Sequence, residues 1–252
     1  MTPTPSPWFP FYKPVAQARL RLFCFPFAGG GAAVFSGWAS GMPPGVEIVA
    51  VQPPGRERRI LEKPFQDVEP LLDSLEPAMA PLLDLPCAFF GYSMGTRIAL
   101  ALAQRWQARG SRPLPVGLVL GASNAPHLPR PHRADLPEAD FIQLLRRYEG
   151  TPAQVFEHKE LMDMVLPTLR ADFAIADGLR SSVPVRAPFS VYGGLEDPHA
   201  SLEELERWHE LTTQSFQVRH FPGKHFFLRT AQDAVLAAVR EDLLRWAPFL
   251  GA

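Results

Sequence analysis

The pentapeptide Gly91-Tyr92-Ser93-Met94-Gly95 contains the residue best suited to nucleophilic chemistry. A serine between two glycines fits a sharp turn from a strand into a helix, because the glycines let the backbone bend tightly and the hydroxyl then projects above the strand. The helix that follows would place free N–H groups and the positive end of its dipole beside that hydroxyl. In the alternative interpretation, Ser93 only caps a helix after a glycine-rich turn.

A serine hydroxyl becomes a good nucleophile only when a positioned base takes its proton, and that base must itself be oriented. The chain has seven histidines and 26 Asp and Glu side chains. Residue type alone therefore does not identify the partners of Ser93. The elements that bring distant loops together must select them.

Short apolar runs, most of them stopped by Gly or Pro, predict strands that are buried on both faces. The predicted strands are 20–25, 46–51, 87–90, 116–120, 189–192 and 216–221. Apolar residues at helical spacing predict helices over 68–79, 96–106, 202–211 and 231–246. The alternation of strand and helix predicts an α/β fold, in which a mostly parallel sheet carries helices on both faces.

The order of these elements selects one acid and one histidine. In α/β hydrolases the serine, the acid and the histidine follow one another along the chain, each in a loop at the carboxyl end of a strand. His225 follows the last predicted strand, and Asp197 follows the strand before it. Glu196 is the alternative acid and His199 the weaker alternative base. The remaining histidines are expected on the surface or packed on the pleat: His127, His132, His158, His209 and His220.

The first strong strand runs into three consecutive glycines in the segment 25–31, FPFAGGG. Such a loop can expose backbone N–H groups, and an α/β hydrolase takes one oxyanion donor from it. We expect the N–H of Ala28, or that of Phe27, to pair with the N–H of Met94 as an oxyanion hole. A phosphate-binding loop is a poorer interpretation, because the segment has no G-K-[ST] or G-x-G-x-x-G pattern.

The composition is that of an ordinary globular protein, with 252 residues, 46% of them hydrophobic and 20% charged. A formal net charge of −1 argues against nucleic-acid binding, which needs surplus Lys and Arg. No apolar run approaches the ~20 residues that span a membrane. Cys24 and Cys87 are far apart and outside any C-x-x-C pattern, so we expect buried free thiols, no metal site and a cytoplasmic location. A monomer is the default expectation.

One connection, about residues 122–187, is too long for a simple crossover. Apolar residues at helical spacing predict one helix around 141–148 and at least one more around 161–173. We expect residues 1–252 to form a single domain in which this insertion is a helical lid over the site. The alternative is a plain two-helix crossover. The apolar stripe from Phe141 to Phe173 is then either an acyl-chain wall or ordinary helix packing.

Six motifs, in order along the chain, resemble those of the type II (external, editing) thioesterases that accompany polyketide synthases and nonribosomal peptide synthetases. They are FPFAGGG (25–31), PPGRERR (53–59), GYSMG (91–95), LRADF (169–173), GGLEDP (193–198) and GKHFF (223–227). The resemblance extends from about Arg19 to the final helix. The chain departs from the family at Tyr92, where members usually have His, and at Thr96 and Arg97, where they usually have small residues.

The resemblance implies an α/β-hydrolase fold with a helical lid, and hydrolysis of acyl groups from the phosphopantetheine arm of a carrier protein. It carries the catalytic triad onto Ser93, Asp197 and His225, and the oxyanion amides onto Ala28 and Met94. It implies no metal and no organic cofactor. Two alternatives stay open: an acyltransferase or general esterase that uses the same triad, and a non-catalytic binding protein of hydrolase fold.

A basic cluster, Arg56, Arg58 and Arg59, follows the second predicted strand. It is either a docking surface for an acidic carrier-protein helix or a solvated loop. Tyr92 borders the nucleophile, so its departure from the family pattern leaves the acyl-chain preference undetermined by the resemblance.

Overall fold

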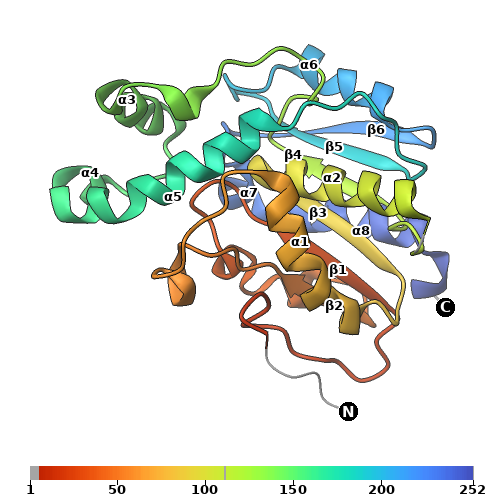
Figure 1. Ribbon diagram of the computed structural model, residues 1–252. Helices are drawn as coiled ribbons and strands as arrows, with labels where there is room; N and C mark the ends of the chain where they lie inside the picture. The colour runs from red at the N-terminus through yellow and green to blue at the C-terminus, as the bar shows by residue number, and fades with distance from the viewer. Residues whose placement is uncertain (1–5, 111, 252) are drawn as a thin grey trace.

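The structure is a computed structural model that describes residues 6–110 and 112–251, and a parallel six-stranded sheet forms its centre (Figure 1). The strand order is β2-β1-β3-β4-β5-β6. All the predicted strands are present, although β3 continues to Tyr92 and β4 begins at Leu118. The strands are β1 (Leu20–Phe25), β2 (Val46–Ala50), β3 (Cys87–Tyr92), β4 (Leu118–Gly121), β5 (Phe189–Gly194) and β6 (Phe216–Phe221).

Helices cover both faces of the sheet, with α1 and α2 on one face and α8 on the other (Figure 1). Alternate side chains of β1 serve the two layers: Phe23 and Phe25 pack with the α1 and α2 core, and Leu22 and Cys24 with the α8 core. The predicted α/β architecture is therefore confirmed. These helices are α1 (Val68–Met79), α2 (Met94–Arg109) and α8 (Gln232–Trp246).

Three of the predicted helices differ from the structure. Helix α2 exceeds the predicted 96–106 at both ends and begins directly after Ser93, whose own backbone is not helical. The predicted helix 202–211 is α6 (Leu202–Glu206), followed by a 3₁₀ segment, Arg207–Leu211. The short helix α7 (Phe227–Thr230) precedes α8 and was not predicted separately.

The segment between β4 and β5 contains α3 (Glu138–Tyr148), α4 (Ala153–Glu157) and α5 (Lys159–Gly178). Figure 1 shows these helices together at one end of the sheet. Helix α5 contacts α2, and the segment has a small apolar core of its own that includes Phe141, Leu145 and Phe173. Both helices predicted in this connection are present.

The chain order creates a crevice at the carboxyl ends of β1 and β3. From β1 the chain moves to β2 on one side and then returns to β3 on the other side of β1. Loops that leave neighbouring strands in opposite directions open a site between them. The loop after β1 and the turn after β3 therefore meet, and Phe25 pairs with Gly91 at this point.

Within the described ranges, no helix is long and apolar enough to cross a membrane. The same residues contain no group of His, Cys, Asp or Glu side chains that could hold a metal ion.

Candidate active site

The turn from β3 into α2 holds Ser93 in an unusual backbone conformation, with φ 52° and ψ −112°. A Cβ atom on Gly91 would lie 2.5 Å from the carbonyl oxygen of Gly95, and one on Gly95 would lie 2.1 Å from that of Phe25. Neither position accepts a side chain without moving backbone. Backbone strain of this kind persists only where the surrounding structure holds it, and it is concentrated at functional sites.

His225 lies between Ser93 and Asp197. Its Nε2 is 3.1 Å from Ser93 Oγ, and its Nδ1 is 2.8 Å from Asp197 Oδ2. The Asp197 side chain is fully buried, and the His225 ring is almost fully buried. Three residues that are distant in the sequence, and that follow β3, β5 and β6, therefore converge in one contiguous hydrogen-bonded row.

The geometry sets the protonation pattern of the imidazole. An ionised carboxylate only accepts hydrogen bonds, so Nδ1 carries the proton toward Asp197 and Nε2 is left as an acceptor for the serine hydroxyl. The second carboxylate oxygen, Asp197 Oδ1, accepts the backbone N–H of His199 at 2.9 Å. His225 can therefore accept the proton of Ser93, and Asp197 can stabilise the resulting imidazolium.

The alternative residues that the sequence left open lie in different surroundings. Glu196 is exposed, whereas Asp197 is buried against His225. His199 lies beside this row, but its ring stacks on Tyr148, with 3.8 Å between ring centroids. Burial and the neighbouring His225 lower the pKa of His199. The exposed histidines are His132, His158, His209 and His220, and His127 is partly buried beside Glu210.

Tyr92 is hydrogen-bonded to the backbone of the loop that carries His225. Its hydroxyl donates to the His225 carbonyl oxygen at 2.7 Å and accepts the Leu228 N–H at 3.2 Å. The Tyr92 side chain is fully buried in the core on the α8 face, and burial raises its pKa well above the usual value. Tyr92 is absent from the walls of the cavity beside Ser93. Tyr92 therefore makes no direct contact with a group bound in this cavity.

The glycine-rich loop after β1 reaches the same site. Ala28 lines the cavity beside Ser93, and Met94 is the first residue of α2, so its N–H has no acceptor within the helix. Asp172 on α5 fixes the loop by accepting the Gly29 N–H at 2.6 Å. Arg56 donates to Asp172 at 2.5 and 2.8 Å and to the Gly30 carbonyl oxygen at 3.3 Å.

Both interpretations of the basic cluster at 56–59 are wrong for two of its members. Arg56 is buried and binds Asp172, so it forms part of the support of the glycine-rich loop. Arg59 is buried between Glu62 and the Gln52 carbonyl oxygen, and it stacks over Trp8. A run of arginines in the sequence does not show which hydrogen-bond acceptors lie beside each arginine, because distant loops supply them. Arg58 is exposed.

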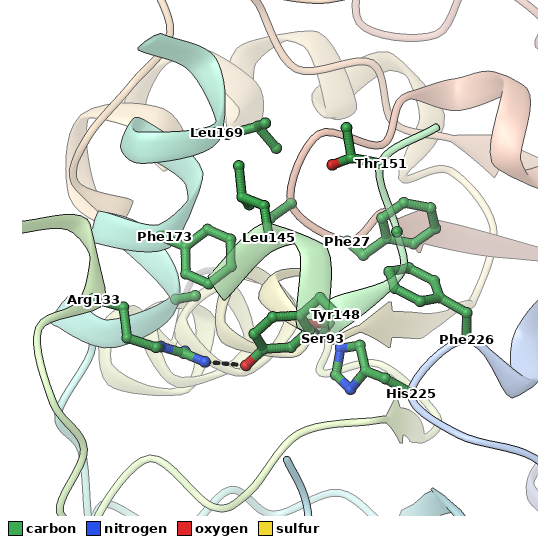
Figure 2. Close-up of a pocket in the computed structure, with 13 residues that line it drawn as sticks. Phe27, Ser93, Arg133, Leu145, Tyr148, Thr151, Leu169, Phe173, His225 and Phe226 are labelled. Atoms are coloured by element: carbon green, nitrogen blue, oxygen red, sulfur yellow. Dashed lines mark hydrogen bonds between the residues drawn. The ribbon is translucent and has the colours of Figure 1, made fainter. Parts of the chain in front are cut away.

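A cavity of about 40 Å³ lies directly beside Ser93 and His225. Helices α3 and α5 supply much of its far wall, including Leu145, Tyr148 and Phe173. Figure 2 shows Tyr148 between Arg133 and His225, and the Tyr148 and His225 rings meet edge to face at 4.9 Å. Tyr148 belonged to the predicted helical stripe, but its contact with the histidines depends on how α3 packs, which the sequence does not show.

A larger groove of about 590 Å³ adjoins this cavity. The two share Phe27, Ala28, Gly150, Thr151 and Leu169 as wall residues. The groove continues along the glycine-rich loop to residues of α4, α5 and α8. The reactive serine therefore lies at the junction of a small inner cavity and a long groove.

A parallel sheet with helices on both faces and a serine on the turn after its third strand defines the α/β-hydrolase fold, and solved thioesterases share the architecture of this chain. The family model for the thioesterase domain matches residues 20–243. The chain belongs to the thioesterase family, and it is a thioester hydrolase.

Several relatives show how specific this membership is. The gramicidin S biosynthesis protein GrsT of Aneurinibacillus migulanus is 37% identical over 225 residues, which cover 88% of each chain. The type II thioesterase BorB of the borrelidin cluster is 32% identical, with a TM-score of 0.83 over 96% of this chain and 100% of BorB. The RedJ thioesterase of the prodiginine pathway in Streptomyces coelicolor is 34% identical, with a TM-score of 0.82 over 94% of this chain and 98% of RedJ. The family resemblance seen in the sequence motifs is confirmed.

Proposed function

We propose that this thioesterase removes acyl groups from the phosphopantetheine arm of carrier proteins, and so edits or regenerates a polyketide or nonribosomal peptide synthase. The observation that carries the proposal is the row Ser93–His225–Asp197 at the junction of a groove and a cavity. The relatives support it, because they include type II thioesterases of such pathways.

In the proposed mechanism, His225 takes the Ser93 proton as the hydroxyl oxygen attacks the thioester carbonyl carbon. The backbone N–H groups of Ala28 and Met94 bind the oxyanion, and loss of one such donor typically costs ~10²–10³ in rate. The C–S bond then breaks, and His225 returns the proton to the departing pantetheine thiolate. Water, deprotonated by the same histidine, hydrolyses the acyl-enzyme and restores Ser93. No step uses a metal or an organic cofactor.

The groove and the cavity match the two parts of this substrate, the pantetheine arm and the acyl group. The long groove accommodates an extended pantetheine arm, and the small inner cavity accommodates a short acyl group beside Ser93. In this proposal residues 1–252 form one domain, and the insertion at about 122–187 is a lid, since its helices α3 and α5 wall the cavity. The enzyme acts as a cytoplasmic monomer that meets the carrier protein only transiently.

The proposal is tested by thiol release from an acyl-phosphopantetheinyl carrier protein and from the matching free acyl thioester, for the wild type and Ser93→Ala. We expect release that favours the carrier-bound substrate and falls by at least ~10⁴-fold in Ser93→Ala. Ser93-dependent release from the free thioester alone would remove the carrier-protein role and keep the hydrolase. Release that does not depend on Ser93 would overturn the triad assignment. Transfer of the acyl group to an added alcohol or amine in preference to water would favour the acyltransferase alternative.

A further inference from the structure

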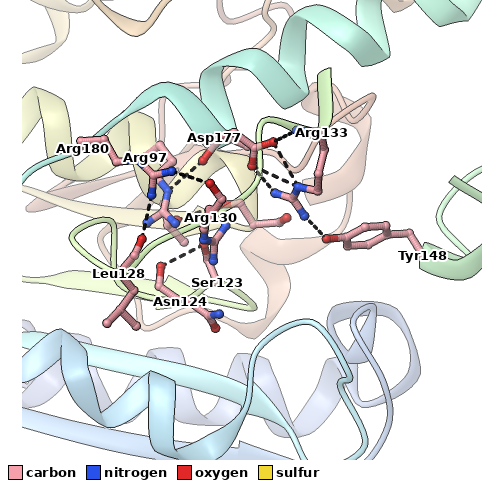
Figure 3. Close-up of polar contacts among 12 residues, drawn as sticks. Arg97, Ser123, Asn124, Leu128, Arg130, Arg133, Tyr148, Asp177 and Arg180 are labelled. Carbon is pink, nitrogen blue, oxygen red and sulfur yellow. Dashed lines mark hydrogen bonds and ion pairs between the residues drawn. The ribbon is translucent and has the colours of Figure 1, made fainter. Parts of the chain in front are cut away.

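The walls of the groove and of the inner cavity include three arginines: Arg56, Arg133 and Arg229. The first two give their guanidinium groups to partners within the protein. Arg56 binds Asp172, as described above. Arg133 donates to Asp177 and to the Tyr148 hydroxyl, and Figure 3 shows this pair of contacts. Both cations are therefore committed to holding the walls together, and neither is free to bind a ligand.

Arg229 has a different environment. It lies on α7, shortly after His225, and its exposed side chain lines the groove. Its Cζ is 5.1 Å from the centre of the Phe27 ring and 5.2 Å from the centre of the Phe226 ring. Within residues 6–110 and 112–251, its guanidinium makes no hydrogen bond and no ion pair. Two aromatic rings therefore hold this cation in place and leave its N–H donors available.

The two rings under Arg229 also mark its distance from the chemistry. Phe27 and Phe226 both line the inner cavity beside Ser93, and Phe27 also lines the groove. Their centroids are 5.0 Å apart, and the Phe226 ring lies 5.2 Å from that of His225 (Figure 2). Arg229 therefore lies where the groove meets the cavity, so a chain that runs along the groove to Ser93 passes this guanidinium.

Other polar side chains of the groove wall are bound to the backbone of nearby loops. Glu57 accepts the Ala33 N–H at 3.3 Å, and the Thr168 hydroxyl donates to the Gly55 carbonyl oxygen at 2.8 Å. Most of the remaining wall residues are apolar or glycine. In binding sites of this kind a few polar groups fix the orientation of the ligand. Arg229 supplies such a group to this groove.

We propose that Arg229 donates hydrogen bonds to an amide carbonyl oxygen of the pantetheine arm and thereby positions the thioester at Ser93. The inference rests on the proposed function, because it places the arm in the groove. Pantetheine is uncharged, its polar groups are amides and hydroxyls, and its first amide follows shortly after the sulfur atom. The phosphate is at the opposite end of the arm from the thioester, whereas Arg229 lies beside the rings that wall the Ser93 cavity.

The chemistry of the guanidinium fits this role. It presents several N–H donors in a planar fork, and a charged donor makes a stronger hydrogen bond to a carbonyl oxygen than a neutral donor does. Because the rings already restrain the Arg229 side chain, binding costs little further conformational entropy. The pantetheine arm does not change between the ground state and the transition state. Loss of this hydrogen bond should therefore appear in KM rather than in kcat.

The test compares propionyl thioesters of three thiols: pentanethiol, which has no amide, N-acetylcysteamine, which has the first amide of the arm, and pantetheine. The measured quantities are kcat and KM, after subtraction of the rate with Ser93→Ala. Arg229→Met keeps an unbranched apolar stem over the rings and removes the donors. We expect it to lower kcat/KM for the pantetheine thioester about tenfold through KM, and to leave the pentyl thioester unchanged. An equal loss with N-acetylcysteamine would assign the bond to the first amide, and a loss with pantetheine alone to the second.

Two other roles of Arg229 predict different results. If Arg229 only supported the loop that carries Phe27, Arg229→Met would lower kcat equally for all three thioesters, and that result would overturn the proposal. If Arg229 only attracted an acidic carrier protein, the loss would be confined to the carrier-bound substrate and would vanish at high salt, which would also overturn it. Arg240→Met, at an exposed position of α8, removes the same charge elsewhere and should change none of these values.

Inhibition provides an independent measurement. S-methylpantetheine has the amides of the arm but no reactive thiol, and it should inhibit hydrolysis of the pentyl thioester competitively. We expect the inhibition to be about tenfold weaker in Arg229→Met, and equal inhibition of the two enzymes would contradict the proposal. If no thioester is hydrolysed in a Ser93-dependent way, the proposed function itself fails. If the three thioesters are hydrolysed with the same relative kcat/KM in the wild type and Arg229→Met, only the further inference fails.

Discussion

The role of Asp197 depends on the hydrogen bond that it accepts from His225 as well as on its charge. Its buried carboxylate holds the Nδ1–H of His225, and an amide in its place can donate to Nδ1 and favour the wrong tautomer. We expect Asp197→Asn to lower kcat for thioester hydrolysis by about 10⁴-fold with little change in stability. Glu196→Gln, at the exposed neighbour, is the matched control and should retain activity. A loss of less than tenfold in Asp197→Asn would argue against the triad.

Tyr92 supports the same histidine from behind. Removal of its hydroxyl leaves the His225 carbonyl oxygen and the Leu228 N–H without this partner, at a cost of about 1–3 kcal/mol for each buried group. We expect Tyr92→Phe to lower both the free energy of unfolding, measured by denaturant titration, and kcat, with KM nearly unchanged. Tyr192→Phe loses a buried hydrogen bond to Asp242, away from the site, and should lose stability only. Equal losses of kcat in both variants would show that Tyr92 has no specific positioning role.

At the residue scale, the sequence predicts the row Ser93–His225–Asp197 because chain order alone selects these residues from many candidates. It does not predict the role of Tyr92, whose partner is the backbone of a loop after β6. It also does not predict the burial of Arg97, because a fully buried arginine runs against the usual preference of that residue for the surface. Contacts of these kinds depend on packing between segments that are distant along the chain.

At the scale of elements, the ion pair between Arg56 and Asp172 connects the loop after β2, the glycine-rich loop and helix α5. Both side chains are buried, and breaking a buried pair costs ~3–5 kcal/mol. We expect Asp172→Ala to lower the free energy of unfolding by about that amount and also to lower kcat, because Ala28 belongs to the loop that loses its anchor. Denaturant titration and hydrolysis kinetics on a free thioester measure both effects.

Asp163 provides the control for this prediction, since it lies on the same helix in an exposed pair with Lys159. Exposed pairs contribute ~0–1 kcal/mol, so Asp163→Ala should change neither quantity much. Full activity in Asp172→Ala despite lost stability would show that the anchor stabilises the fold without positioning the loop.

The elements themselves were largely predictable. Buried parallel strands and amphipathic helices leave strong patterns, so the strands and the long helices appear where apolar spacing places them. The exceptions are short: α6 gives way to 3₁₀ geometry after Glu206, and α7 has a single turn. Elements this short depend on their neighbours more than on their own periodicity. The contact between α3 and the site also required the structure, because a helical stripe does not say which partner it faces.

At the scale of the whole molecule, the sheet separates two apolar cores, and each contains one free cysteine. Cys24 belongs to the core on the α8 face, and Cys87 to the core beneath α1 and α2. Burial raises the pKa of Cys87 to about 12 and that of Cys24 well above its usual value. The predicted inert core thiols are therefore found where apolar packing disfavours the thiolate.

This burial links stability to alkaline pH. Below the ordinary thiol pKa of ~8.5, both thiols are protonated in the folded and the unfolded chain, and the linkage contributes nothing. As pH rises from there toward the folded pKa of about 12 for Cys87, the unfolded chain releases protons that the folded chain keeps. The free energy of unfolding should therefore fall by up to ~1.4 kcal/mol per pH unit for each thiol.

Denaturant titrations at several pH values between about 8 and 9.5 measure this slope, because the buried Tyr92 and Tyr192 hydroxyls contribute only above the ordinary tyrosine pKa of ~10. Replacing both cysteines with alanine should flatten this slope, because the slope depends on ionisation of the thiols. The two small cavities lower the free energy of unfolding by the same amount at every pH, so they do not change the slope. The native enzyme should also react with a thiol reagent only as fast as it unfolds, since the thiolate is the reactive species. An unchanged slope in the double alanine variant, or rapid labelling of the folded chain, would mean that the two cores do not exclude the thiolates as tightly as their packing implies.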